Sequence, residues 1–167
     1  MNRNGFTILE VMVVIGIFMV LISGIYSVLV CGQNSWAICG TQMDISSSAR
    51  KAMYKMAEEL SQAGLTTVNI SAALDSIVFQ IPDTFSAGSI NWSNQIRYAL
   101  GGVNGQQLLR TDLGSGNVEA WANHITQLQF NQTTADTVEI QLTLSKQSMR
   151  GDILSMQVST QVKVRNE

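Results

Sequence analysis

The sequence is poor in the residues that build catalytic and metal sites. Its 167 residues include one histidine, His124, and two cysteines, Cys31 and Cys39. This set does not supply the four ligands of a structural zinc site, and the scattered aspartates and glutamates show no calcium-loop spacing. A lone histidine is rarely catalytic without partners. We therefore expect no catalytic residue, no metal, no cofactor and no enzyme.

Charged residues are also scarce, at 13% of the chain, with a formal net charge of -2. Beyond Arg50 and Lys51 the basic residues are scattered singly, so the chain lacks the basic surface of a nucleic-acid-binding protein. We expect no nucleic-acid partner. The shortage is greatest from Val11 to Met43, where no aspartate, glutamate, lysine, arginine or histidine occurs.

The first part of this uncharged region, residues 11–31, is almost wholly apolar. As a helix it would be about 32 Å long, which matches the hydrocarbon thickness of a bilayer. A buried helix of a soluble protein is the alternative, but a domain of this size could not cover it on all sides. Arg3 precedes the segment, and Arg50 and Lys51 lie well beyond it, which favours a cytoplasmic N-terminus.

A secretory signal peptide is the nearest alternative to a permanent anchor, but Glu10 at the start of the apolar run argues against it. A carboxylate costs about 2.5–3.5 kcal/mol at the bilayer centre and less near the interface. Glu10 therefore either pairs with a cation or extends to the lipid headgroups.

The order Gly5, Phe6, Thr7, Glu10 and then an apolar run resembles the class III signal of prepilins and type II secretion pseudopilins. The resemblance implies that a prepilin peptidase removes a leader, residues 1–5, after Gly5 and methylates Phe6. It implies that residues 6–31 remain as a transmembrane and filament-core helix, and that Glu10 contacts the N-terminal amine of a neighbouring subunit.

The same resemblance implies a location and partners. The chain would cross the bacterial inner membrane once, with a cytoplasmic N-terminus and a periplasmic C-terminal domain. It would assemble into a filament with other major and minor pilins or pseudopilins. Many major pilins carry a proline near the position of Ser27, whereas the one proline here is Pro82, so the straightness of the anchor is not settled by the resemblance.

Residues 32–64 are expected to form an outer amphipathic helix. Its first part, residues 32–43, contains poor helix formers, so one continuous helix and two helices joined within residues 32–40 both remain open. On one helix, Cys31 and Cys39 would be about 12 Å apart along the axis, beyond disulfide reach. Lys55 and Glu59 form an i,i+4 pair, and Gly64 is placed to end the helix. Apolar residues recur at helical spacing: Ile45, Ala49, Ala52, Met53, Met56, Leu60 and Ala63.

Residues 65–167 are expected to form a β-rich exported domain, so the predicted fold class is α+β, with a long N-terminal helix packed on an antiparallel sheet. Gly101–Gly105 is a predicted hairpin loop. Trp36, Trp92 and Trp121 are expected to pack in the core or in turns rather than at an interface. Alternating apolar residues and turn signals predict strands at 76–81, 94–100, 106–111, 125–130, 137–144 and 153–164.

Four segments, 96–100, 105–110, 125–130 and 162–166, resemble J-type minor pseudopilins of type II secretion and W-type minor pilins. This resemblance implies a minor subunit at or near the tip of a type II secretion pseudopilus that helps to start assembly and protein export. A minor pilin of a type IV pilus or competence filament is the alternative. A single-pass exported binding or sensor protein is the alternative of another class, and cleavage after Gly5 distinguishes it.

Overall fold

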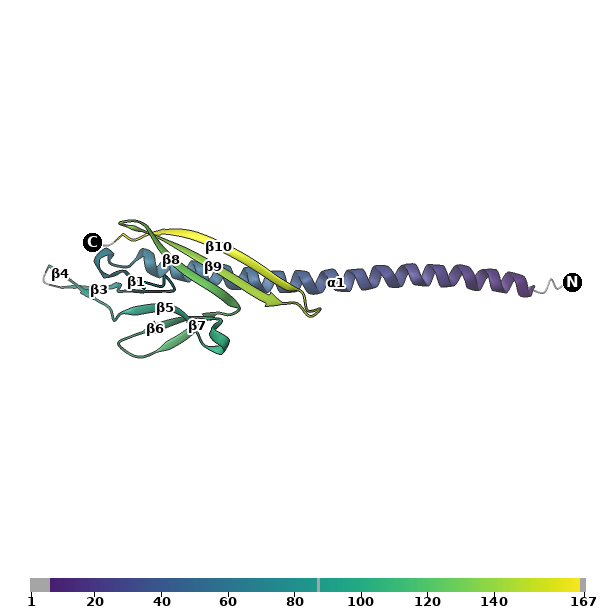
Figure 1. Ribbon diagram of the computed structural model, residues 1–167, viewed down its shortest axis with the longest axis horizontal. Helices are drawn as coiled ribbons and strands as arrows, with labels where there is room; N and C mark the ends of the chain where they lie inside the picture. Colours follow the sequence, from purple (N-terminus) through teal and green to yellow (C-terminus); the bar gives the residue numbers. More distant parts are fainter. Residues whose placement is uncertain (1–6, 87, 166–167) are drawn as a thin grey trace. The chain divides into compact units, whose positions relative to one another are not determined.

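The computed structural model describes residues 7–86 and 88–165. The chain divides into two units, Met1–Gly40 and Thr41–Glu167. Helix α1 (Ile8–Ser61) contains 54 residues and is unbroken (Figure 1). Of the two alternatives for the N-terminal region, one continuous helix is confirmed. Gly32 and Gly40 each cost about 1 kcal/mol relative to alanine, and the helical residues on either side of them outweigh that cost.

The C-terminal unit consists of the last part of α1 and three antiparallel sheets, in agreement with the predicted α+β class. A five-stranded sheet has the order β1-β2-β5-β6-β7, a three-stranded sheet has the order β10-β9-β8, and β3 pairs with β4. The strands are β1 (Asn69–Ile70), β2 (Ser76–Phe79), β3 (Pro82–Ser86), β4 (Ser89–Trp92), β5 (Ile96–Gly101), β6 (Gln107–Asp112), β7 (Val118–Ala122), β8 (Ile125–Thr134), β9 (Thr137–Gln147) and β10 (Ile153–Lys163).

The core forms where the apolar stripe of α1 meets the sheets. The central strand β9 alternates between half-buried and buried residues, so one face is turned inward. Phe79 of β2, Tyr98 of β5 and Phe130 of β8 are almost fully buried beside it. The helical stripe predicted from the spacing is confirmed for the members that lie on α1, which are buried: Ile45, Ala49, Ala52, Met53, Met56 and Leu60. Ala63 is also buried but lies two residues beyond the end of the helix.

The six predicted strands are confirmed to within a few residues, apart from the end of β8. The hairpin loop is also confirmed: β5 pairs with β6, and the short 3₁₀ turn η2 (Val103–Gly105) joins them. Gly102 and Gly105 have positive φ there, which glycine adopts without steric cost. The sequence did not reveal β1, β3, β4 and β7, because they have two to five residues and lack a long alternation.

Gly64 does not end the helix in the way that the sequence suggested. Helix α1 ends at Ser61, and Gly64 is extended, with φ -77° and ψ 129°, rather than in the left-handed conformation of a helix-ending glycine. A Cβ atom at Gly64 would instead collide with the ring of Trp92. Gly64 is therefore explained by the close packing of Trp92 from the end of β4.

The three tryptophans differ in their surroundings. Trp92 is half-buried over Gly64, and Trp121 of β7 packs on Tyr98 with ring centroids 5.3 Å apart. The expected core or turn packing holds for these two. It is wrong for Trp36, which is 83% exposed on α1, because it lies in the N-terminal unit, where no sheet covers the helix.

Candidate functional site: the uncovered helix start and the helix–sheet ion pair

The start of α1 is capped by Thr7. The backbone N–H of Glu10 donates to the Thr7 hydroxyl at 3.3 Å and to the Thr7 carbonyl at 3.1 Å. A threonine followed three residues later by a glutamate is the capping-box pattern. The pattern is visible in the sequence, although we did not infer it there. It gives Glu10 a local role, because a carboxylate in the first turn is stabilised by the helix dipole.

Of the site residues inferred from the sequence, Gly5 and Phe6 lie outside the described residues. Glu10 is exposed on the first turn of α1. Its position is compatible with both interpretations of its charge, pairing with a cation and extension to the lipid headgroups. Glu10 thus stands at the N-terminal border of the apolar helix, with its backbone used in the cap and its carboxylate accessible.

The apolar part of α1 has no protein cover in the described structure. Residues 8–29 are exposed, including Phe18 and Leu21 at 58% and 55%. Within the described residues, α1 is the one helix long and apolar enough to cross a membrane. Cys31 and Cys39 follow as exposed free thiols. A helix that is apolar on all sides and uncovered requires lipid or other helices around it.

Glu59 connects the covered part of α1 to the five-stranded sheet, which corrects its assignment to Lys55. Arg110 Nε of β6 lies 3.0 Å from Glu59 Oε1 and 3.1 Å from Oε2, and the Tyr98 hydroxyl donates to Glu59 Oε2 at 2.8 Å. Lys55 instead pairs with Glu58 at 3.5 Å. The Glu59 and Arg110 side chains are only 21% and 19% exposed.

The rings of Trp121 and Tyr98 surround the Glu59–Arg110 ion pair and help to hold both side chains in place. The Arg110 guanidinium lies 5.6 Å from the centroid of the Trp121 ring, within the range of a cation–π contact. Burial tends to lower the pKa of Arg110, but the hydrogen bond and charge of Glu59 outweigh it and raise that pKa. Burial, with the charge of Glu59, raises the pKa of Tyr98. Arg110 therefore stays charged and Tyr98 stays a neutral donor across the physiological range.

A second ion pair joins α1 to the three-stranded sheet. Lys146 Nζ of β9 lies 2.9 Å from Asp44 Oδ2, and both side chains retain contact with solvent. The hydrogen bond and the charge of Lys146 lower the pKa of Asp44. The pair places the turn between β9 and β10 beside the first covered turns of the helix. The five-stranded sheet and the three-stranded sheet are thus each tied to α1 by an ion pair.

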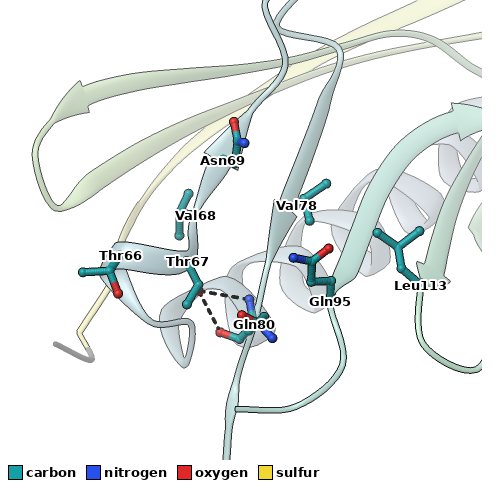
Figure 2. Close-up of a pocket in the computed structure, with 8 residues that line it drawn as sticks. All are labelled: Thr66, Thr67, Val68, Asn69, Val78, Gln80, Gln95 and Leu113. Carbon is teal, nitrogen blue, oxygen red and sulfur yellow. Dashed lines mark hydrogen bonds between the residues drawn. The ribbon is translucent and has the colours of Figure 1, made fainter.

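The surface near β1 and β2 carries a shallow hollow of about 530 Å³, shown in Figure 2. Its polar side chains include Thr67, whose hydroxyl accepts from the Gln80 N–H at 3.1 Å and donates to the Gly64 carbonyl at 2.8 Å. The Gln80 amide donates to the Ser93 carbonyl at 2.8 Å. These groups hold local backbone, and no charged side chain lines the hollow. We therefore assign it no ligand.

Comparison with known proteins adds one finding. Residues 1–26 match the family model of the prokaryotic N-terminal methylation motif. Searches of curated proteins and of solved structures give no significant match. The matched segment includes Gly5, Phe6, Thr7 and Glu10 and most of the apolar run. Together with the single long helix packed on antiparallel sheets, it supports a pilin-like protein, a structural rather than enzymatic class, with a single-pass N-terminal anchor.

Proposed function

We propose that the chain is a minor pseudopilin, a structural subunit at or near the tip of a type II secretion pseudopilus that helps to start assembly and protein export. The observation that carries the proposal is the methylation motif at residues 1–26, which leads directly into an uncovered apolar helix. The covered half of the same helix supports a β-rich domain that can make lateral contacts. A minor pilin of a type IV pilus or competence filament uses the same parts.

In this function the N-terminal residues act in order. A prepilin peptidase cleaves after Gly5 and methylates Phe6, which leaves a short mature N-terminus before the Thr7 cap. The α-amino group is a cation, and Glu10 of a neighbouring subunit is the carboxylate that pairs with it inside a filament of low dielectric. The pairing offsets the cost of placing Glu10 at the edge of the membrane.

Mass spectrometry of the N-terminus tests the proposal. Protein isolated from a host with an active prepilin peptidase should begin at Phe6 and carry one methyl group. A matched host that lacks the peptidase should yield the chain with residues 1–5 attached. A mature protein that still begins at Met1 in the first host, or is cleaved near residue 20 or beyond, would contradict the proposal and favour an exported binding or sensor protein.

A second test separates the roles of Glu10. Glu10→Ala should leave membrane insertion intact, because the change removes a charge from the start of the span. It should reduce filament or secretion output, because the neighbouring amine loses its partner. Glu10→Asp is the matched control, since it keeps the charge. Normal output from Glu10→Ala would instead favour a carboxylate that only extends to the headgroups.

A further inference from the structure

Strand β10 forms an open edge of the three-stranded sheet. It pairs with β9 over eleven residues, from Ile153 opposite Gln147 to Lys163 opposite Thr137. In the part of the chain that the structure describes, β9 is the one strand beside it. Figure 1 shows β10 in yellow along the outside of this sheet, running in the same direction as the covered half of α1.

The hydrogen bonds that flank the strand show which backbone groups face outward. Ser148 N–H donates to the Asp152 carbonyl, and Val164 N–H donates to the Asp136 carbonyl, each at 2.8 Å. Hydrogen-bonded positions alternate along an antiparallel pair, so the even-numbered residues of β10 bond to β9. The odd-numbered residues therefore direct N–H and C=O groups to the open edge: Ile153, Ser155, Gln157, Ser159, Gln161 and Lys163.

This edge lacks the features by which soluble proteins prevent strand pairing. Such features are short edge strands, prolines, bulges, lysines along the strand and inward-facing charges. The pairing of β10 with β9 has no register shift over its full length, and β10 contains no proline. Its single charged residue, Lys163, stands at the end and pairs with Asp136 at 2.9 Å.

We propose that the open edge of β10 binds a β-strand donated by a different subunit of the same filament, which extends the three-stranded sheet by one strand. This inference rests on the proposed function for the identity of the neighbour, but the open edge itself is a property of the fold. Backbone hydrogen bonds would supply the affinity, as in other cases of strand addition.

The β10 strand of a second copy of this chain is a poor partner for β10. Two copies of β10 paired antiparallel are related by a two-fold axis across the strands, which reverses one copy. Because β10 runs along the covered half of α1, the two helices would then point in opposite directions. In a filament of equally oriented subunits the covered helix halves share one direction, so this pairing is disfavoured between copies of this chain.

A parallel pair of two β10 strands is disfavoured for another reason. In a parallel ladder a residue of one strand bonds to the two residues on either side of the one opposite it. The odd-numbered residues of both copies can therefore bond only if one strand is shifted by one residue along the other. A two-fold axis allows no such shift, because it places each residue opposite its own copy. A strand from a different subunit meets neither restriction, because its direction relative to its own anchor is independent of this chain.

The side chains of β10 define the chemistry of the incoming strand. On the outer face Ser155, Gln157, Ser159 and Gln161 are exposed and uncharged. On the inner face Leu154, Met156 and Val158 are only half-buried and pack against the core. Cross-strand neighbours pair by type. The partner is therefore a strand that alternates apolar residues toward α1 with neutral polar residues toward solvent.

Proline substitution at an outward-facing position tests the proposal with little effect on the sheet itself. Gln157→Pro removes an outward N–H group, which an edge strand tolerates, and Gln157→Ala is the matched control that keeps it. The full chain would be co-expressed with the subunits of its own genome that carry the same N-terminal motif, and purified in mild detergent. We expect Gln157→Pro to lower the amount of co-purified subunit by about tenfold, and Gln157→Ala to leave it unchanged.

Hydrogen exchange of the unmodified chain gives an independent measurement if Gln157→Pro does not fold. In the complex, the odd-numbered amides of β10 should exchange at least about tenfold more slowly than in the chain purified alone. Equal exchange rates would overturn the proposal, as would undiminished co-purification of a folded Gln157→Pro chain. A complex that contains only copies of this chain would overturn the choice of partner.

The N-terminal mass of the same samples separates this proposal from the proposed function. Methylated Phe6 with no protection of β10 leaves the pseudopilin role intact and removes the edge contact. An N-terminus that begins at Met1 removes the pseudopilin role, whatever happens at β10.

Discussion

The two parts of helix α1 share one backbone conformation and have opposite surroundings. Before residue 30 every described residue is exposed, although almost all are apolar. From Thr41 onward every third or fourth residue is buried against the sheets. The comparison shows that burial within the protein and apolar composition are separate properties. An apolar residue of the first part stabilises the helix in a membrane or among other helices. An apolar residue of the second part stabilises the folded C-terminal unit.

The largest difference in stability should appear when a methionine is replaced by alanine in each of the two parts of the helix. Met56 is 1% exposed and Met12 is 69% exposed. Met56→Ala should lower the free energy of unfolding of the C-terminal unit by about 2–5 kcal/mol, as for other buried methionines, while Met12→Ala should leave it unchanged. Unfolding of the full chain in detergent, followed by tyrosine and tryptophan fluorescence, measures both. Equal effects would show that the two parts do not differ as described.

The Glu59–Arg110 ion pair should give the next largest effect. Arg110→Met leaves the Glu59 carboxylate without its cation, and because both side chains retain about a fifth of their exposure the expected loss is about 2–3 kcal/mol, below that of a fully buried pair. Adding Glu59→Gln should recover most of the stability, since glutamine still accepts from Tyr98. The loss of unfolding free energy in the double variant could instead equal the sum of the losses in Arg110→Met and Glu59→Gln. That result would mean that the two residues act independently.

Glycine substitutions compare an uncovered position on α1 with a tightly packed position just after the helix. Gly64→Ala should destabilise by about 1–3 kcal/mol, because the new methyl group meets the Trp92 ring. Gly40→Ala is the matched control: nothing lies within 4 Å of its Cβ position, and the helix should gain up to about 1 kcal/mol. Calorimetry would measure both, and a neutral Gly64→Ala would contradict the packing assigned to Trp92.

The smallest effect concerns Asp136 at the turn between β8 and β9. Hydrogen bonds from Lys163, Thr134 and Thr137 lower the pKa of Asp136 to about 2. A carboxyl group with a depressed pKa contributes stability above its ordinary pKa near 3.8 and loses it as the pH falls toward 2. The melting temperature should therefore decline slightly less between pH 5 and pH 2 in Asp136→Asn than in the unmodified chain. The carbon chemical shift of the carboxyl group reports the pKa directly.

Periodicity made most of the fold predictable. The three- and four-residue spacing of apolar residues predicted the helical stripe, and two-residue alternation predicted β9 and β10, because both patterns follow from the geometry of one element. Glu59 was not predictable in this way. It stands near Lys55 and Glu58 in the sequence and looks like part of the solvent-facing side, and its true partner Arg110 is 51 residues away. Gly64 was misjudged for the same reason, since Trp92 is supplied by a separate hairpin.

The N-terminal motif was easier to recognise than the packing, because it is a linear sequence pattern. Gly5, Phe6 and Glu10 fall within the matched residues 1–26. The Thr7 cap was also available from the Thr-x-x-Glu spacing. The open edge of β10 was not, since the sequence alone does not tell which strands lie at the border of a sheet.

The distance along the chain between α1 and β10 has a consequence for the order in which the core is made. Helix α1 is synthesised well before Val162 and Val164, which are 5% and 4% exposed. The apolar stripe of the helix and the strand that completes its cover are separated by about a hundred residues of translation. The core therefore cannot close until β10 has been synthesised, and a chain cut short before β10 would leave β9 and the stripe open to aggregation.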